Sequence, residues 1–446
     1  MAWPARIRNR PLLRRPRWTC CLRLPVAESA PPPPLPDGTW WRGVEVVRHA
    51  RRGAAQHIAH ELGRALVSTR SSAVSVDLVD AVGATLACDV HALCPVPHYA
   101  SSAMDGYAVC GSGPWRVMTG DTSVHDAAST AALELAPSQA VPVVTGGVIP
   151  GGTDTVIRDE YALRTGDELR FDDSCPTSEL EGRHIRPAGT ECRSGERILT
   201  AGSVLSPADI ALAAVSGVDK VPVVPVPDAR LLLTGSEVQS SGVPTPGFVR
   251  DAFAPTVPPV LTSLGARVDS VRRLPDDAAV FAAALDVAIT DRVPLVITTG
   301  GTARSRADHV RAHLERRTTP IIDELDLQPG HPTLFAACGP GTAVLALPGN
   351  PLAAMTALTV LAVPFLCGLL GRPAPVPVSV TVAHEIAGTR RERLVPAFQH
   401  ADGAWSPCRQ IGANMLRGLS SAQALLSVPV EGLSAGARTE ALALPW

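Results

Sequence analysis

The chain has 446 residues, of which 46% are hydrophobic and 18% charged, and its formal net charge is −2. This length predicts several domains with separate cores, and the absence of a basic stripe in the body of the chain argues against a dedicated nucleic-acid binder. The ten cysteines show no metal-ligand spacing, which favours free thiols in a reducing cytoplasm. Lys220 is the only lysine, so nearly every positive charge is an arginine.

Residues 1–42 are predicted to form a disordered, basic and proline-rich tail outside the folded domains. Arg14 and Arg15 resemble a twin-arginine export signal. Arg23 and Pro25, however, interrupt the apolar segment that such a signal requires. We therefore exclude this segment from the fold.

Two glycine-rich segments come next along the chain. In PHYASSAMDGYAV, residues 97–109, Asp105 precedes a glycine, which by itself is typical of a turn. Residues 141–157, VPVVTGGVIPGGTDTVI, combine an apolar run with two glycine pairs. The first run predicts a strand that enters a tight turn.

The best-ordered pattern lies between residues 229 and 371, where apolar runs alternate with helical periods. Buried strands that do not alternate in polarity, separated by helices, indicate a doubly wound α/β domain. The expected strands are 229–233, 267–274, 294–299 and 343–347, and the expected helices are one beginning near Pro258, 276–291, 307–316 and 351–371.

Three loops follow the carboxyl ends of these strands and are expected to face one ligand. After the third strand, Gly300 and Gly301 permit backbone amides to converge on a phosphate, although a tight structural turn explains them equally well. Asp308, one turn into the next helix, is a candidate ligand for a metal ion, or else a solvated acid. The turn Pro348-Gly349-Asn350-Pro351 is stiffened by its prolines and offers the Asn350 amide at a helix start.

The uncharged helix at 351–371 passes the length test for a membrane span. Thr356, Thr359, Pro364 and Gly368 interrupt it, and a predicted strand precedes it directly. A buried helix packed on a parallel sheet accounts for both features, so we favour that alternative.

Taken in order, these segments resemble the molybdopterin molybdenumtransferases, a family that includes the C-terminal domain of gephyrin. The resemblance covers about residues 43 to 446, and its specificity rests on the order and spacing of the motifs. They are SAMDGYAV at 102–109, VTGGVIPGGTDTVI at 144–157, GRHIRPAGTE at 182–191, LTGSE at 233–237, TTGG at 298–301, QPGHP at 328–332 and LPGNPLAA at 347–354.

The resemblance implies a multidomain α/β plus β protein with four folded parts. These are a discontinuous N-terminal domain at 43–90 and 189–222, an inserted mostly β domain at 91–188, a doubly wound molybdopterin-binding α/β domain at 223–375 and a small C-terminal β-barrel at 376–446. The alternation in residues 376–382 and the Asp402-Gly403 turn independently favour strands in the last part.

The implied reaction inserts molybdate into adenylylated molybdopterin and releases AMP, with Mg²⁺ as the usual helper. The implied protein is a cytoplasmic homodimer whose site is shared between protomers. A molybdopterin adenylyltransferase would act before it, and molybdoenzymes or their chaperones would receive the product. Nucleic acid and membrane are not expected partners.

Matching positions in the motifs imply the site residues. The expected catalytic carboxylates are Asp105, Glu237 and Asp308, of which Glu237 and Asp308 would bind the metal ion. The expected pterin and nucleotide contacts are Thr145, Gly300, Gly301, His331, Gly349, Asn350, Pro351 and Arg393, although Arg393 is equally well explained as a surface arginine.

Several positions depart from the family pattern. Ser236 replaces an acid of the usual TGDE loop, SRADH replaces GEADY, and Ala413 lacks a frequent hydroxyl. Gln328 and His331 replace the two lysines of the usual KPGKP. The loss of fixed positive charge should weaken anion binding, because glutamine is neutral and the charge of histidine depends on pH.

Two alternatives to an active transferase follow. A protein of the same fold that carries or stores the cofactor is motivated by Gln328, His331 and Ser236. An unrelated dinucleotide enzyme is disfavoured, because no dinucleotide fingerprint is present. His309 and His313 are four residues apart on a helix but lack the glutamate of a zinc-protease motif, so we expect no zinc site there.

Overall fold

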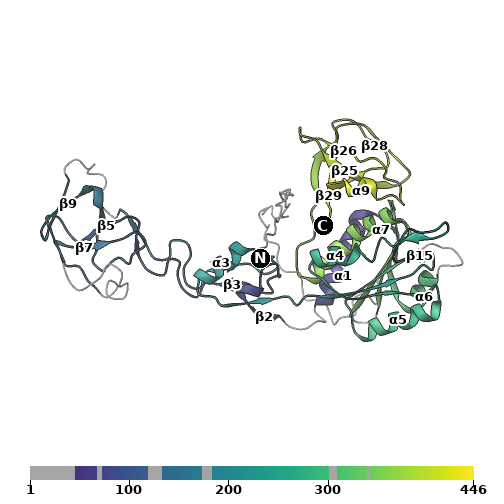
Figure 1. Cartoon of the computed structure of the whole chain (residues 1–446), viewed down its shortest axis with the longest axis horizontal. Helices are drawn as coiled ribbons and strands as arrows, with labels where there is room; N and C mark the ends of the chain where they lie inside the picture. Colours follow the sequence, from purple (N-terminus) through teal and green to yellow (C-terminus); the bar gives the residue numbers. More distant parts are fainter. Residues whose placement is uncertain (1–45, 68–72, 119–132, 173–182, 301–308, 339–340) are drawn as a thin grey trace, which may run out of the picture. The chain divides into compact units, whose positions relative to one another are not determined.

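The computed structural model describes residues 46–67, 73–118, 133–172, 183–300, 309–338 and 341–446 (Figure 1). The predicted tail at 1–42, Gly301 and Asp308 lie outside the described residues.

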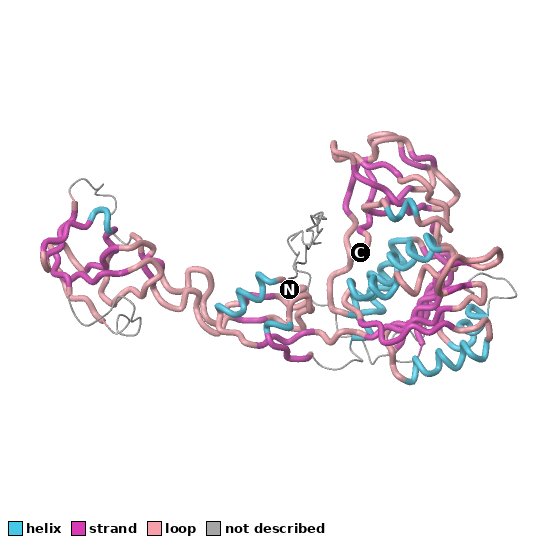
Figure 2. Tube along the Cα trace, in the orientation of Figure 1, coloured by secondary structure: helices cyan, strands magenta, loops and turns pink. Residues whose placement is uncertain are grey.

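A seven-stranded sheet forms the centre of the α/β domain (Figures 1 and 2). The strands β22, β18, β14 and β17 are parallel, and β21 is antiparallel to both of its neighbours. In spatial order the strands are β1 (Val47–Ala50), β19 (Thr319–Leu325), β21 (Leu334–Cys338), β22 (Thr342–Leu347), β18 (Leu295–Thr299), β14 (Asp228–Leu233) and β17 (Arg267–Arg273). The chain runs from β14 outward to β17 and then returns to β18 on the other side of β14. This reversal confirms the doubly wound arrangement and creates a switch point between β14 and β18.

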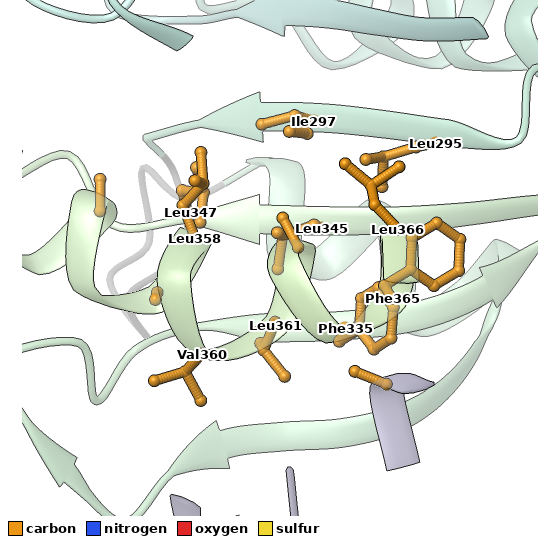
Figure 3. Packing of buried hydrophobic residues seen from close by; sticks show 14 of the residues in the cluster. Leu295, Ile297, Phe335, Leu345, Leu347, Leu358, Val360, Leu361, Phe365 and Leu366 are labelled. Atoms are coloured by element: carbon orange, nitrogen blue, oxygen red, sulfur yellow. The ribbon is translucent and has the colours of Figure 1, made fainter. Parts of the chain in front are cut away.

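Helices cover both faces of this sheet, as the unbroken apolar strands require. Leu232, Val296 and Val344 pack on the face covered by α5 and α6, whereas the alternate residues Ile297 and Leu345 pack on the opposite face (Figure 3). The helices are α5 (Ala278–Thr290) and α6 (His309–Arg317) on one face, and α1 (Arg52–Val67), α4 (Val257–Ser263), α7 (Pro351–Ala357), a π-helical segment (Leu358–Ala362) and α8 (Val363–Leu369) on the other.

The predicted apolar helix is the continuous segment from α7 to α8, and it belongs to the core. Its most apolar 18-residue window has a mean hydropathy of 2.1, which satisfies the membrane-span test, yet 89% of that window is buried inside the protein. The rings of Phe365 and Phe335 meet edge to face with centroids 5.6 Å apart (Figure 3). Contact with the sheet therefore accounts for its hydrophobicity.

The strand β1 and the helix α1 lie within the predicted segment 43–90 but pack with the α/β sheet. β1 pairs with β19, and Ala59, Leu62 and Leu66 of α1 join the same buried cluster as α8. At the crossing of the two helices, a Cβ on Gly63 would lie 2.1 Å from the Phe365 carbonyl oxygen. A Cβ on Gly368 would lie 2.1 Å from the His60 carbonyl oxygen. Glycine is thus required where the two backbones touch.

A small second core joins two segments that are distant in sequence. Leu86, Leu199, Leu205 and Val221 are buried together. Ser206 and Asp209 form a capping box at the start of the local helix. The elements are β2 (Val74–Asp77) paired with β13 (Lys220–Val223), β3 (Val90–His91) paired with β12 (Arg197–Leu199), the 3₁₀ turn Leu78–Asp80 and α3 (Pro207–Val215).

The segment that connects β3 to β12 is mostly β. Its six-stranded sheet buries Val109, Trp115, Ile157 and Leu169. In spatial order the strands are β8 (Thr155–Arg158), β5 (Gly106–Val109), β7 (Gln139–Val143), β6 (Trp115–Val117), β10 (Glu168–Phe171) and β9 (Ala162–Thr165); β4 (Ser101–Ser102) pairs with β11 (Ile185–Arg186), and a 3₁₀ turn covers Asp159–Tyr161.

The C-terminal part is also mostly β, and the predicted Asp402-Gly403 turn joins two of its strands. One strand, β20, comes from the α/β segment, so the two parts share a sheet. In spatial order the sheet comprises β20 (Leu327–Gln328), β25 (Glu392–Gln399), β27 (Ala424–Val428), β29 (Arg438–Ala443) and β23 (Val378–Thr381), and β26 (Trp405–Pro407) also pairs with β25. The C-terminal part also contains the pair of β24 (Ile386–Ala387) with β28 (Gly432–Leu433) and the helix α9 (Arg417–Ser420). In the α/β segment, β15 (Val238–Gln239) pairs with β16 (Val249–Arg250).

The contact between α1 and α8 predicts a strong effect of a single methyl group. Gly368→Ala should lower the free energy of unfolding by about 1–3 kcal/mol, because the added carbon collides with backbone that cannot move independently. Gly53→Ala, at the exposed start of α1 with nothing within 4 Å of its Cβ, is the matched control and should be neutral or slightly stabilising. Thermal and denaturant unfolding of both variants measure the difference, and equal stabilities would contradict this account of the crossing.

Candidate functional site

The three loops at the carboxyl edge of the sheet meet, as their positions after β14, β18 and β22 predict. The Thr234 hydroxyl donates a hydrogen bond of 2.6 Å to the Thr299 carbonyl, and the Gly300 amide donates one of 3.1 Å to the Leu347 carbonyl. A Cβ on Gly349 would lie 3.9 Å from the Gly300 Cα. Gly300 and Gly349, both expected site residues, are therefore in adjoining turns.

The amides of the first loop already bind a carboxylate of the protein. Gly235 and Ser236 donate to the two oxygens of Asp276 at 2.9 and 2.7 Å, and the Asp276 amide is 3.4 Å from the Ser236 hydroxyl. The sequence placed Asp276 only at the start of the expected helix 276–291. Its pairing with the loop was missed, because the helix α4 and the strands β15, β16 and β17 separate the two segments in the chain. The expected metal ligand Glu237 is exposed and lies next to Gly235.

A cavity of about 300 Å³ borders the loop after β22 and brings together three of the expected site residues, His331, Asn350 and Arg393. Two glycine-containing turns of the α/β domain form one side, and residues of the C-terminal part form the other. Its lining comprises residues 327–332, Pro348, Asn350, Ala353, Thr389, Arg391, 393–396 and 411–413.

Two arginines supply positive charge to this cavity. The pairing of β20 with β25 places Arg393 opposite Gln328. Arg391 lines the same cavity and forms an ion pair of 3.2 Å with Asp326. Sequence reasoning missed Arg391, which directly precedes β25; its only signal was its place two residues before Arg393. The neutral Gln328 therefore lies beside a cation from the C-terminal sheet.

The turn before α7 is held by the C-terminal segment GANML. The Leu352 and Ala353 amides, at the N-terminus of α7, donate to the Ala413 carbonyl at 3.0 and 3.2 Å. The missing hydroxyl at Ala413 does not affect this contact, since the backbone makes it. Asn350 precedes α7, which begins with Pro351, and forms no side-chain capping bond. Asn350 is one of the residues that line the cavity.

Asp105 and Thr145 form a pair within the six-stranded sheet. One Asp105 oxygen accepts from the Thr145 amide at 2.7 Å and from the Thr145 hydroxyl at 3.1 Å. Gly106 has a φ of +153°, and a Cβ there would lie 1.9 Å from the Ile157 carbonyl oxygen. Only glycine fits after Asp105, which explains the Asp-Gly step as more than a flexible turn. This pair lies on a different sheet from Gly300 and Asn350.

Comparison with known proteins gives a consistent result. Residues 47–217 match the family described as "MoeA N-terminal region (domain I and II)", and residues 230–367 match the "Probable molybdopterin binding domain". A molybdopterin molybdenumtransferase of Synechococcus elongatus is 32% identical over 294 residues, which cover 62% of this chain and 70% of that relative. Molybdopterin molybdenumtransferase 2 of Mycobacterium tuberculosis is 28% identical over 384 residues, covering 82% and 93%. The crystal structure of the molybdopterin biosynthesis MoeA protein from Pyrococcus horikoshii shares the fold, with a TM-score of 0.70, 21% identity and coverage of 90% and 99%.

The fold and the matched regions define a multidomain α/β protein with a probable molybdopterin-binding domain. The chain belongs to the molybdopterin molybdenumtransferase family, and it is a transferase of molybdenum cofactor biosynthesis.

The contact between Asp276 and the first loop predicts a local effect that a neighbouring aspartate does not share. Asp276→Asn should speed hydrogen exchange at the Gly235 and Ser236 amides, because it removes a charge-assisted acceptor. Asp277→Asn is the control: Asp277 caps α5 by accepting from the Ala279 and Val280 amides, so only those amides should exchange faster. Exchange followed by NMR distinguishes the sites, and identical patterns in both variants would refute the assignment.

Proposed function

We propose that the chain inserts molybdate into adenylylated molybdopterin and releases AMP, in a reaction that depends on Mg²⁺. The observation that carries this proposal is the cavity where Asn350, Arg391 and Arg393 line one space beside the converged loops. Two guanidinium groups and an amide are suited to phosphate and other oxyanions, since arginine binds them with paired N–H donors. The family to which the chain belongs supplies the identity of the substrate.

We assign the metal ion to carboxylates at the edge of the α/β sheet. Glu237 is exposed beside the loop after β14, and a carboxylate is a donor that Mg²⁺ prefers. Asp308, the second proposed ligand, lies outside the described residues and follows Gly300 in the sequence, before α6 begins at His309. A bound Mg²⁺ would neutralise charge on the phosphates. The residues of this chain would orient the substrate, with Arg393 and Asn350 contacting the anionic groups and the loops excluding water.

We also propose a cytoplasmic homodimer in which Asp105 of one protomer completes the site of the other. The Asp105 carboxylate is held by Thr145 at a loop between strands, which gives it a defined direction without burying it. An exposed, oriented carboxylate is suited to act on a ligand bound by another surface. An adenylyltransferase that makes the substrate and molybdoenzymes or their chaperones that receive the product are the proposed partners.

A carrier that binds the cofactor without inserting molybdenum is the second candidate, and Gln328 and His331 in the cavity wall favour it. Neither side chain supplies a permanent positive charge. Arg391 and Arg393 favour the transferase, because they provide fixed charge in the same cavity.

The transferase proposal predicts AMP release from adenylylated molybdopterin when molybdate and Mg²⁺ are supplied to the purified protein. Asp308→Asn and Asp105→Asn should each reduce turnover without changing the melting temperature. Omission of Mg²⁺ from the assay should also reduce turnover. Tight binding of the cofactor without AMP release between pH 6 and 8 would reject the transferase in favour of the carrier.

Arg393 and Gln328 allow a test of charge within the cavity. Arg393→Ala should lower kcat/KM about 10- to 100-fold, as expected when a hydrogen bond to a charged group is lost. Gln328→Lys should raise kcat/KM and make it more sensitive to salt. Arg409→Ala, an exposed arginine of the C-terminal part outside the cavity lining, is the control and should leave both quantities unchanged. If Arg393→Ala left kcat/KM unchanged, the assignment of this cavity as the substrate site would be wrong.

A further inference from the structure

His49, Glu324 and His331 form a cluster at the edge of the seven-stranded sheet. β1 and β19 are parallel, and the pairs Arg48 with Asp323 and Ala50 with Leu325 leave His49 opposite Glu324. One oxygen of Glu324, Oε2, lies 3.4 Å from His49 Nδ1 and 3.3 Å from His331 Nε2. All three ligand atoms lie within 4.8 Å of one another.

The backbone is unusual at two of these residues. His49 has a φ of +51° and Glu324 a φ of +71°, which lie in the left-handed region that residues other than glycine seldom occupy. Their adjacent positions on neighbouring strands bring the two side chains into contact. Such backbone strain, when the surrounding structure maintains it, is frequent at ligand-binding positions.

His331 is oriented as a metal-binding histidine would be. Its Nδ1 lies 2.8 Å from the Leu325 carbonyl, which can only accept, so Nδ1 carries the proton. In the neutral ring Nε2 then carries an unprotonated lone pair, and this atom faces the Glu324 carboxylate. A cation between these atoms satisfies both lone pairs. The bond from Nδ1 to a backbone carbonyl is the outer contact that fixes the tautomer of metal ligands.

The two distances from Glu324 Oε2 to the imidazole nitrogens match those around a tetrahedral ion. Ligands bonded at about 2.0–2.1 Å to a tetrahedral Zn²⁺ lie about 3.3 Å from one another, which is close to the observed 3.3 and 3.4 Å. We propose that His49, Glu324 and His331 bind Zn²⁺, with water as the fourth ligand. The side chain of His49 is 55% exposed, so the ion and its water can reach solvent. Glu324 Oε1 lies on the side of Arg311, 3.7 Å from its guanidinium, and Oε2 lies on the side of the two imidazoles.

The donor set distinguishes this ion from the proposed Mg²⁺. Two imidazole nitrogens favour zinc over magnesium, which prefers oxygen ligands. His331 also lines the cavity, so the bound ion would add positive charge near the position where the family pattern has a lysine. This last consequence rests on the proposed function, whereas the metal site itself does not.

Competition with a chromophoric chelator tests the site on the full chain, after removal of metals and with the thiols kept reduced. His49→Ala, Glu324→Gln and His331→Ala should each weaken Zn²⁺ binding at the site by at least about tenfold, the effect that loss of even an outer contact can produce. His57→Ala, an exposed histidine on α1, is the matched control and should bind as the parent does. An excess of Mg²⁺ should not compete.

His331→Lys guards against misfolding as an explanation, because lysine can form an ion pair with Glu324. This variant should melt at or near the temperature of the metal-free parent and yet lose the site. Co²⁺ bound in place of Zn²⁺ should show no intense sulfur charge-transfer band, since no cysteine is a ligand. Equal Zn²⁺ affinity in the parent, His49→Ala and His331→Ala, or a sulfur band abolished by none of the three substitutions, would overturn the proposal. Either result would leave the transferase proposal standing, because no pterin is present in the assay.

Discussion

The burial of both faces of β18 and β22 is the constraint on which the rest of the structure depends. Every residue of these two strands is buried, and their side chains alternate between two helical layers. Parallel strands cannot be joined by short hairpins, so the chain between two of them returns to the amino edge, and all of these strands end at the same carboxyl edge. The loops after β14, β18 and β22 therefore meet, and the hydrogen bonds of Thr234 and Gly300 hold them in register. The site follows from the packing rather than from any single motif.

The cavity itself requires a second part of the chain. β20 joins the C-terminal sheet, Ala413 caps the helix α7, and Leu394 and Leu425 are buried in the same cluster as Leu352. The apolar contacts and the capping bonds thus hold Arg391 and Arg393 against a turn from the α/β domain. A domain that ended after α8 would keep the converging loops but would lose the cations on the opposite wall.

Local patterns predicted the elements of the α/β domain well, because four apolar runs and their helices carry a clear period. They did not predict the antiparallel strands β19 and β21, whose sequences lack a strong alternation. They also missed the position of β1 at the sheet edge. Pairing of β1 with β19 joins segments separated by most of the chain, and a short strand of mixed polarity carries no signal of its partner. For the same reason the sequence indicated His331 and Asn350 singly, but not Asp276, Arg391 or the contact of His49 with Glu324.

The neighbours of Gln328 and His331 explain in physical terms how these two residues depart from the family pattern. Fixed charge missing from the turn 328–332 is present on β25 instead, where Arg393 lies opposite Gln328. A strand holds an arginine more rigidly than a turn holds a lysine, and the guanidinium contacts an oxyanion through two donors rather than one. His331 is tied to the Leu325 carbonyl and to Glu324, so a longer, more mobile lysine would have to give up the first contact to reach the cavity. The altered positions therefore have neighbours of opposite character: Arg393 of β25 places a fixed positive charge beside Gln328, and the carboxylate of Glu324 lies beside His331.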